Sequence, residues 1–152
     1  MNPGYFECRT FDKIDYTENA LGKGEYDNCT FITCNFSNAD ITEIHFSECV
    51  FLGCNLSMAK LIKTSFRDVK FQDCKMLGLH FENCNQFGLS FSIDNCNLTH
   101  SSFYQVKLKM TNFRNVQFHE VDFLESDLSG STFNNCDLKG AIFDHSIIEK
   151  TD

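Results

Sequence analysis

The sequence of 152 residues predicts a solenoid whose backbone turns at short and regular intervals. Two observations predict this fold: a large apolar residue recurs at every fifth position, and a small residue recurs two positions before it. A period of five fits neither the period of about 3.6 of a helix nor the period of about 2 of a flat strand. The length is that of one domain, so the solenoid is expected to occupy residues 1–152 as a single unit.

The column of large apolar residues runs in steps of five over residues 6–91 and resumes over residues 98–148. Of its 29 positions, 28 carry a large apolar residue, and 16 of the 17 phenylalanines of the chain fall on it. Gln86 is the exception, and the one phenylalanine outside the column, Phe87, follows it directly. This irregularity predicts a local bulge at these two residues.

The second column consists of small or β-branched residues. Its members include Cys29, Cys34, Ala39, Cys49, Cys54, Thr64, Val69, Cys74, Cys96, Ser101, Val121, Ser126, Cys136 and Ala141. A large residue at one inward position and a small one at the other fill a narrow tube without voids. The other three positions of each five are mostly polar, so we expect them to face outward.

Both columns together resemble the pentapeptide-repeat family, whose pattern is A(D/N)LXX with Leu or Phe at the centre. The clearest instances are Ala39-Asp40-Ile41, Cys34-Asn35-Phe36, Cys54-Asn55-Leu56, Cys96-Asn97-Leu98, Ser126-Asp127-Leu128 and Cys136-Asp137-Leu138. The resemblance covers nearly the whole chain and implies a right-handed quadrilateral parallel β-helix with four repeats per coil. The 29 repeats then make about seven coils, or a rod of about 35 Å at about 4.8 Å per strand spacing.

With four repeats per coil, residues 20 apart are expected to stack. One such column is predicted to contain seven phenylalanines, namely Phe11, Phe31, Phe51, Phe71, Phe91, Phe113 and Phe133. The last two follow a shift of two residues, and we expect the extra residues at a corner around residues 92–94.

The nine cysteines and five histidines do not form a chemical site in the sequence pattern. Eight of the nine cysteines occupy the small inward position, where a thiol acts as a small hydrophobe. No two histidines share a column, and neither a nucleophile elbow nor a phosphate-binding glycine loop occurs. We therefore expect structural thiols, no catalytic residue, no metal site and no cofactor, and hence a protein that is not an enzyme.

The charge is unevenly spread along the chain. The net charge is −8, from 21 acidic and 13 basic residues, which argues against a non-specific nucleic-acid binder. Residues 1–50 carry a net charge of −6, residues 51–114 carry +4 and residues 115–152 carry −6. No stretch is long and apolar enough to span a bilayer, and no secretory signal precedes residue 8, so we expect a cytoplasmic protein without a membrane partner.

A more specific resemblance lies between Cys54 and Phe81. The stretches Ser65-Phe66-Arg67-Asp68 and Cys74-Lys75-Met76-Leu77-Gly78 are similar to the quinolone-resistance branch of the family. This resemblance implies binding to DNA gyrase or topoisomerase IV by imitation of duplex DNA, without direct binding of nucleic acid. Duplex DNA carries roughly 20 negative charges over about 35 Å, against −8 for the whole chain, so only one acidic end is expected to act as the mimic.

The acidic side chains expected at that end are Asp122, Glu125, Asp127, Asp137 and Asp144. The alternative is a structural scaffold or interaction rod with an unrelated protein partner. Because open strand edges invite other chains, a homodimer through the C-terminal coil is also expected. Its predicted interface consists of Ile142, Phe143, Ile147 and Ile148.

Overall fold

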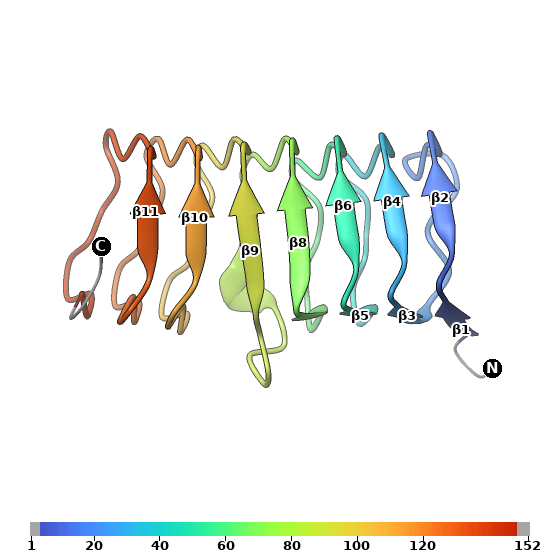
Figure 1. Ribbon diagram of the computed structural model, residues 1–152, viewed down its shortest axis with the longest axis horizontal. Coiled ribbons are helices and arrows are strands. Elements are labelled where there is room, and N and C mark those ends of the chain that lie inside the picture. The colour runs from blue at the N-terminus through green and yellow to red at the C-terminus, as the bar shows by residue number, and fades with distance from the viewer. Residues whose placement is uncertain (1–3, 149–152) are drawn as a thin grey trace.

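The computed structural model describes residues 4–148, which wind as a right-handed parallel solenoid (Figure 1). Each coil contributes one strand to a sheet of seven, so the solenoid has seven coils. The predicted all-β solenoid of about seven coils is therefore confirmed. A single 3-10 turn, η1 (Phe81–Asn83), is the only helical element among the described residues.

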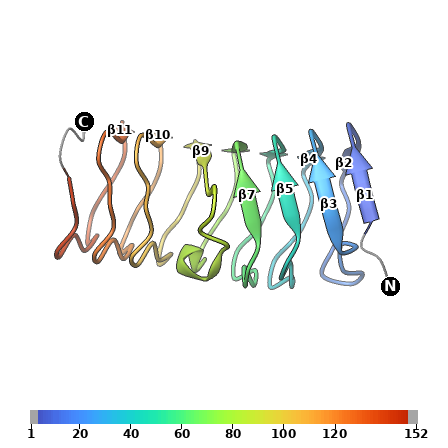
Figure 2. The ribbon, with the colours of Figure 1, turned by 90° about the horizontal axis from the view of Figure 1, so that it is seen from below.

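Two of the four sides of the solenoid carry sheets, which we call face A and face B (Figure 2). Face A has the strand order β1-β3-β5-β7, and face B has the order β2-β4-β6-β8-β9-β10-β11. The strands of face A are β1 (Gly4–Glu7), β3 (Gly24–Asp27), β5 (His45–Ser47) and β7 (Ser65–Arg67). The strands of face B are β2 (Thr10–Asp12), β4 (Thr30–Ile32), β6 (Val50–Leu52), β8 (Val69–Gln72), β9 (Phe91–Asp94), β10 (Asn112–Arg114) and β11 (Thr132–Asn134).

The other two sides, faces C and D, are held by single bridges between successive coils. Face C runs from the bridge between Asp15 and Asn35 to that between Gln117 and Asp137, and face D ends at the bridge between Asp122 and Ile142. Face A continues beyond its sheet in the same way, through bridges that join Lys107, Asp127 and Ile147.

The large apolar column fills the interior of the tube. Phe31 and Phe51 stack with their ring centroids 4.9 Å apart, and Phe51 and Phe71 stack at 5.2 Å. All three side chains are almost completely buried. Rings on adjacent faces meet edge to face, as Phe46 and Phe51 do at 5.2 Å. Both arrangements are favoured by the charge distribution of aromatic rings.

The predicted column of seven phenylalanines and the predicted position of the two extra residues are wrong. In the ladder of β8 and β9, Phe71 pairs with Ile93, and Phe91 pairs with Val69. Phe91 therefore takes a position of the small column, and Ile93 takes the place in the phenylalanine stack. The extra residues consequently lie before β9, in a loop of residues 85–90, and not around residues 92–94. The reason is that β9 turns both Phe91 and Ile93 inward, where both are buried.

The small column is selected for hydrogen bonding as well as for size. The hydroxyl of Thr64 donates to the carbonyl oxygen of Ile41 over 2.7 Å, and the thiol of Cys54 is 3.2 Å from the carbonyl oxygen of Phe31. Each acceptor lies 23 residues earlier, at the centre of a repeat in the preceding coil. A short side chain with a donor thus links two coils, because a buried carbonyl oxygen has capacity for a second hydrogen bond.

The polar position before each centre also has a structural task on faces C and D. The side-chain oxygen of Asn35 accepts the amide hydrogen of Ser37 at 3.0 Å, and Asp122 accepts that of Leu124 at 2.8 Å. The residue two after the centre then turns the corner in the left-handed region, for example Asn38 at φ 58°. The Asp or Asn of the repeat is therefore a turn-forming residue.

Candidate functional site

The five predicted acidic residues do not form one patch, because they are distributed over three faces. Asp122, Glu125 and Asp144 belong to face D, where the backbone amide of Glu125 donates to the carbonyl oxygen of Asp144 at 2.9 Å. Asp127 belongs to face A, and Asp137 belongs to face C. The carboxylates thus surround the C-terminal coils on three sides.

Several of these carboxylates also stabilise the solenoid. Asp127 accepts hydrogen bonds from the hydroxyl and the backbone amide of Ser129, and these bonds lower the pKa of its carboxyl. Asp137 lies 2.6 Å from Nε2 of His119, and this hydrogen bond holds its pKa below the usual value. Both carboxylates are therefore ionised at neutral pH while they also take part in turns.

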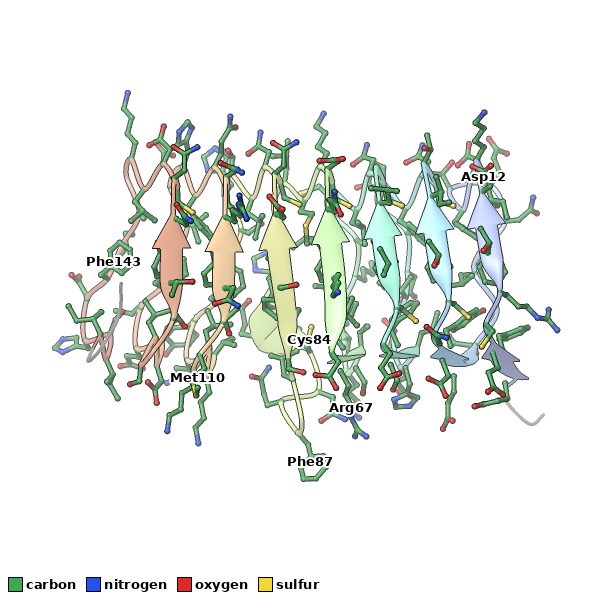
Figure 3. All side chains as sticks on the ribbon, in the orientation of Figure 1. Asp12, Arg67, Cys84, Phe87, Met110 and Phe143 are labelled. Carbon is green, nitrogen blue, oxygen red and sulfur yellow. The ribbon has the colours of Figure 1, made fainter. Side chains whose placement is uncertain are left out.

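Residues 85–90 form the predicted bulge, which projects from the solenoid beyond face A (Figure 3). Phe87 stands at its tip with 78% of its surface exposed. Burial of a phenylalanine side chain is worth about 2 kcal/mol, which the chain does not gain here. The apolar interior is completed instead by Leu89, which packs against the core from the same loop.

Hydrogen bonds give this loop a defined shape. The side-chain amide of Gln86 donates to the carbonyl oxygens of Phe81 at 3.1 Å and of Cys84 at 2.9 Å. The side-chain oxygen of Asn85 accepts the amide hydrogen of Phe87 at 3.0 Å. The guanidinium of Arg67 lies over the Phe87 ring, 5.5 Å from its centroid. The exposed ring is thus presented by a structured loop.

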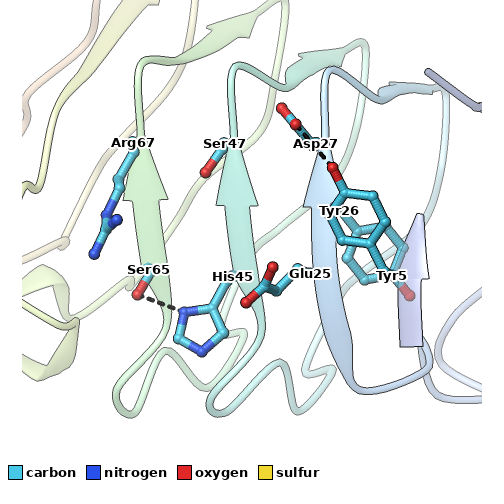
Figure 4. A pocket seen from close by; sticks show the side chains of 8 residues that line it. All are labelled: Tyr5, Glu25, Tyr26, Asp27, His45, Ser47, Ser65 and Arg67. Carbon is cyan, nitrogen blue, oxygen red and sulfur yellow. Dashed lines mark hydrogen bonds between the residues drawn. The ribbon is translucent and has the colours of Figure 1, made fainter. Parts of the chain in front are cut away.

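A hollow of about 340 Å³ lies on face A between the first strand and the loop (Figure 4). Its lining residues come from β1, β3, β5 and β7, and they are Tyr5, Glu25, Tyr26, Asp27, His45, Ser47, Ser65 and Arg67. The carboxylates lie toward β1, and the guanidinium lies at the opposite end. The hollow exists because the outward side chains of Ser47 and Ser65 are short.

Two hydrogen bonds order the lining of the hollow. The hydroxyl of Tyr5 donates to Oδ2 of Asp27 at 3.1 Å, and this bond raises the pKa of the tyrosine. Nδ1 of His45 lies 2.9 Å from the hydroxyl oxygen of Ser65. Sequence reasoning missed this hollow, although reading the outward residues in steps of 20 shows two serines between acidic and basic side chains.

The thiols lie largely inside the tube. Seven cysteines are buried, while Cys136 is partly buried and Cys8 is exposed. Burial raises the pKa of Cys49 to about 12, which keeps this thiol protonated and unreactive at neutral pH. Among residues 4–148, no three His, Cys, Asp or Glu side chains are placed to hold a metal ion together.

The four residues of the predicted dimer interface lie at the outer edge of the last described coil. Ile142 and Ile147 are each 48% exposed, and Ile148 is 60% exposed. Phe143 is partly buried and stacks on Phe123 at 5.0 Å. The homodimer interface predicted from these four residues stays a prediction.

No helix within the described part of the chain is long and apolar enough to cross a membrane.

Comparison with known proteins identifies the repeat. Residues 25–92 match the family model described as a pentapeptide repeat region, and residues 96–135 and 122–152 match the model for eight copies of the pentapeptide repeat. A search of curated protein sequences gives no significant match.

Two solved structures illustrate the similarity. The full-length QnrB1, a plasmid-mediated fluoroquinolone resistance protein, is 22% identical with a TM-score of 0.48, and the match covers 98% of this chain and 86% of that one. HetL, a pentapeptide-repeat protein involved in heterocyst differentiation regulation in Nostoc sp. strain PCC 7120, is 12% identical with a TM-score of 0.35, over 97% and 86% of the two chains. On the family models and the coil geometry, this chain belongs to the pentapeptide-repeat proteins.

Proposed function

We propose that this chain is a non-catalytic, cytoplasmic protein-binding rod that engages DNA gyrase or topoisomerase IV through its acidic C-terminal coils. In this proposal the coils occupy part of the surface on which the enzyme otherwise holds duplex DNA. The observation that carries the proposal is the density of negative charge on these coils, together with its distribution around the rod.

The density can be compared with that of DNA. Residues 115–148 carry six acidic residues and one basic residue, a net charge of −5. They correspond to about 1.7 coils, or about 8 Å of rod length. Duplex DNA carries about five phosphate charges over the same distance. The C-terminal coils therefore match DNA in charge per length, although the whole rod with its basic middle does not.

The distribution around the rod supports the same proposal. Asp122, Glu125 and Asp144 lie on face D and Asp137 lies on face C, while Asp127 lies on face A with its side chain 15% exposed and 3.4 Å from Nζ of Lys109. A DNA-binding groove contacts phosphates on more than one side of the duplex. Carboxylates on three sides of a rod suit such a groove better than a flat patch does.

A gyrase supercoiling assay, with and without a fluoroquinolone, tests the proposal. We expect the protein to inhibit supercoiling at high concentration or to protect the enzyme from the drug. The test variant combines D122N, E125Q, D127N, D137N and D144N, which remove five charges and keep the acceptor oxygens of the turns. We expect it to lose the effect.

A matched control removes five charges at the other end of the rod. It combines D12N, E18Q, E25Q, E43Q and E48Q, so that its net charge equals that of the test variant. We expect the control to retain most of the effect. Equal activity of the wild type and the test variant would reject the acidic end as the binding surface. No effect of the wild type at any concentration would favour a scaffold with an unrelated partner.

We also propose that the C-terminal coil forms a homodimer through Ile142, Phe143, Ile147 and Ile148. All four side chains are apolar, the three isoleucines are exposed, and Phe143 is partly buried. The expected result is a dimer in sedimentation equilibrium at about 10 μM protein that becomes monomeric in the I147D variant at the same concentration. A wild-type monomer at millimolar concentration would contradict this interface.

A further inference from the structure

The polar surface of face A is arranged in rungs, each made of the two outward side chains of one coil. In the order of the coils, they are Tyr5 and Glu7, Glu25 and Asp27, His45 and Ser47, Ser65 and Arg67, the loop 85–90, Lys107 and Lys109, and Asp127 and Ser129. Successive rungs are about 4.8 Å apart. This face combines a protruding aromatic side chain with a hollow, and an acidic rung with a basic one.

The positions of these features are related by symmetry about the rung of Ser65 and Arg67. The hollow above Ser47 lies one rung before it, and the loop that carries Phe87 lies one rung after it. The acidic rung, Glu25 and Asp27, lies two rungs before it, and the basic rung, Lys107 and Lys109, lies two rungs after it. Consider a twofold axis that passes through this central rung, in the plane of the face and perpendicular to the rod. It would place each feature of one copy opposite its counterpart on a second copy.

We propose that face A binds a second copy of this chain, with the two rods antiparallel. Phe87 of each copy enters the hollow of the other, and the lysines of each copy lie over the carboxylates of the other. The axis places the outward residues that precede the repeat centres in one copy over the same kind of residue in the other copy, so that Lys107 meets Glu25. The outward residues that follow the centres meet in the same way, so that Lys109 meets Asp27. The interface is therefore complementary in both shape and charge.

The charged groups that this contact requires have few partners within one copy. Among the ion pairs of residues 4–148, none includes Glu25, Asp27 or Lys107. Lys109 lies 3.4 Å from Asp127 at the surface, a pair that is 61% exposed on the lysine side and is easily exchanged. The second copy thus supplies counter-charges that the single chain lacks.

The shape of the two elements also fits a contact between copies. The loop protrudes along the direction in which face A looks, and the hydrogen bonds of Gln86 and Asn85 fix it before binding. The hollow of about 340 Å³ is floored by short serine side chains and has the ring of Tyr5 at one end. An exposed aromatic side chain that fits a hollow is the usual anchor of a protein interface.

The proposed contact is small, so the association is expected to be weak. Each copy contributes about five rungs of one face, which is near the lower size limit of specific interfaces. The two Arg67 guanidinium groups also approach each other at the axis, and this like-charge contact opposes binding. Each of them remains stacked on the Phe87 ring of its own copy.

Charge reversal tests the proposal by sedimentation velocity at up to about 1 mM protein, where weak interfaces assemble. All variants carry I147D, which removes any association through the C-terminal coil. The basic-rung variant adds K107E and K109E, and the acidic-rung variant adds E25K and D27K. We expect each variant alone to associate at least about tenfold more weakly than the I147D parent.

The decisive sample is the equimolar mixture of the two variants. In the mixture, both sets of opposed charges are attractive again, so association is expected to return to within about threefold of the parent. A single chain with all four reversals is expected to recover in the same way. The control variant adds K70E and R114E on face B, which change the net charge by the same amount as K107E and K109E, and we expect it to associate like the parent.

Two results would overturn the proposal. One is an I147D parent that remains monomeric throughout the concentration range. The other is a mixture that stays as weak as its components, or a control on face B that weakens association as much as the basic-rung variant. The F87S variant is expected to lose association without any change in net charge, which separates the anchor from the charges.

Discussion

The phenylalanine stack makes a strong prediction for the F51A variant. Phe51 lies at the centre of β6 and is completely buried. Its ring stacks between those of Phe31 at 4.9 Å and Phe71 at 5.2 Å, and it meets the rings of Phe36 and Phe46 edge to face. The variant therefore removes one side chain from the middle of a continuous stack.

The expected loss of unfolding free energy follows from the environment of this ring. Truncation of a buried phenylalanine to alanine costs about 3–5 kcal/mol, because a cavity remains in addition to the lost burial. Neighbours above and below are held by the coils and cannot collapse into the space, so a value of about 4 kcal/mol is expected. That is a large part of the 5–15 kcal/mol typical of a domain. The F51L variant keeps most of the volume and is expected to lose only about 1 kcal/mol.

The control is F143A in the last described coil. Phe143 is only partly buried and stacks on Phe123 alone, so a loss of about 1–2 kcal/mol is expected. Urea unfolding followed by circular dichroism, at a concentration low enough to keep the protein monomeric, measures all three variants. Equal losses in F51A and F143A, or a loss below about 2 kcal/mol in F51A, would refute the stacked interior as the main source of stability.

Three further predictions concern individual residues. The pKa of Asp137 is lowered by its hydrogen bond with His119, so the contribution of this carboxylate to stability is present above about pH 4 and is lost as the pH falls through the folded pKa. The urea concentration at the midpoint of unfolding should therefore fall less steeply between about pH 7 and pH 2 in the D137N variant than in the wild type. A thiol reagent should modify Cys8 rapidly in the native protein and buried thiols such as Cys49 only after unfolding, and fast reaction of several thiols would contradict the buried column. The G24A variant should detach β1 from β3, because the new Cβ would lie 2.1 Å from a backbone oxygen of β1; hydrogen exchange of residues 4–7 reports this.

Most of the fold could be predicted from the sequence, because one physical constraint repeats at every coil. A narrow tube requires a large residue at one inward position and a small one at the other. Cys29 with Phe31 and Thr111 with Phe113 both follow this pattern, although they lie in different coils. The stacking of residues 20 apart then follows from four such repeats per coil. The residues that close each turn follow the same period, which is why Asn and Asp precede the centres.

The register after the fourth coil could not be predicted in the same way. Two extra residues anywhere between Phe81 and Leu98 leave the later columns unchanged, and Phe91 suits both positions on a strand. What decides the register is the packing of Phe91 and Ile93 together, with Leu89 completing the interior. Such a choice depends on side chains from several coils, which no single repeat contains.

The candidate surfaces were predictable only in part. The charge of the C-terminal coils is visible in the composition, but the sequence does not show that Asp122, Asp127 and Asp137 also accept hydrogen bonds within turns. The hollow depends on side chains 20 residues apart on neighbouring strands. It becomes visible only when the outward columns are aligned with the correct register.

The regular pairing of coils also limits how such a chain can change during evolution. Duplication or loss of a full 20-residue coil keeps every later pair in register and alters only the length of the rod, by about 4.8 Å. An insertion of any other size has to form a loop that projects from the solenoid, as residues 85–90 do. Small insertions are therefore a natural source of new protruding surface on this scaffold, while the stacked interior beneath them stays intact.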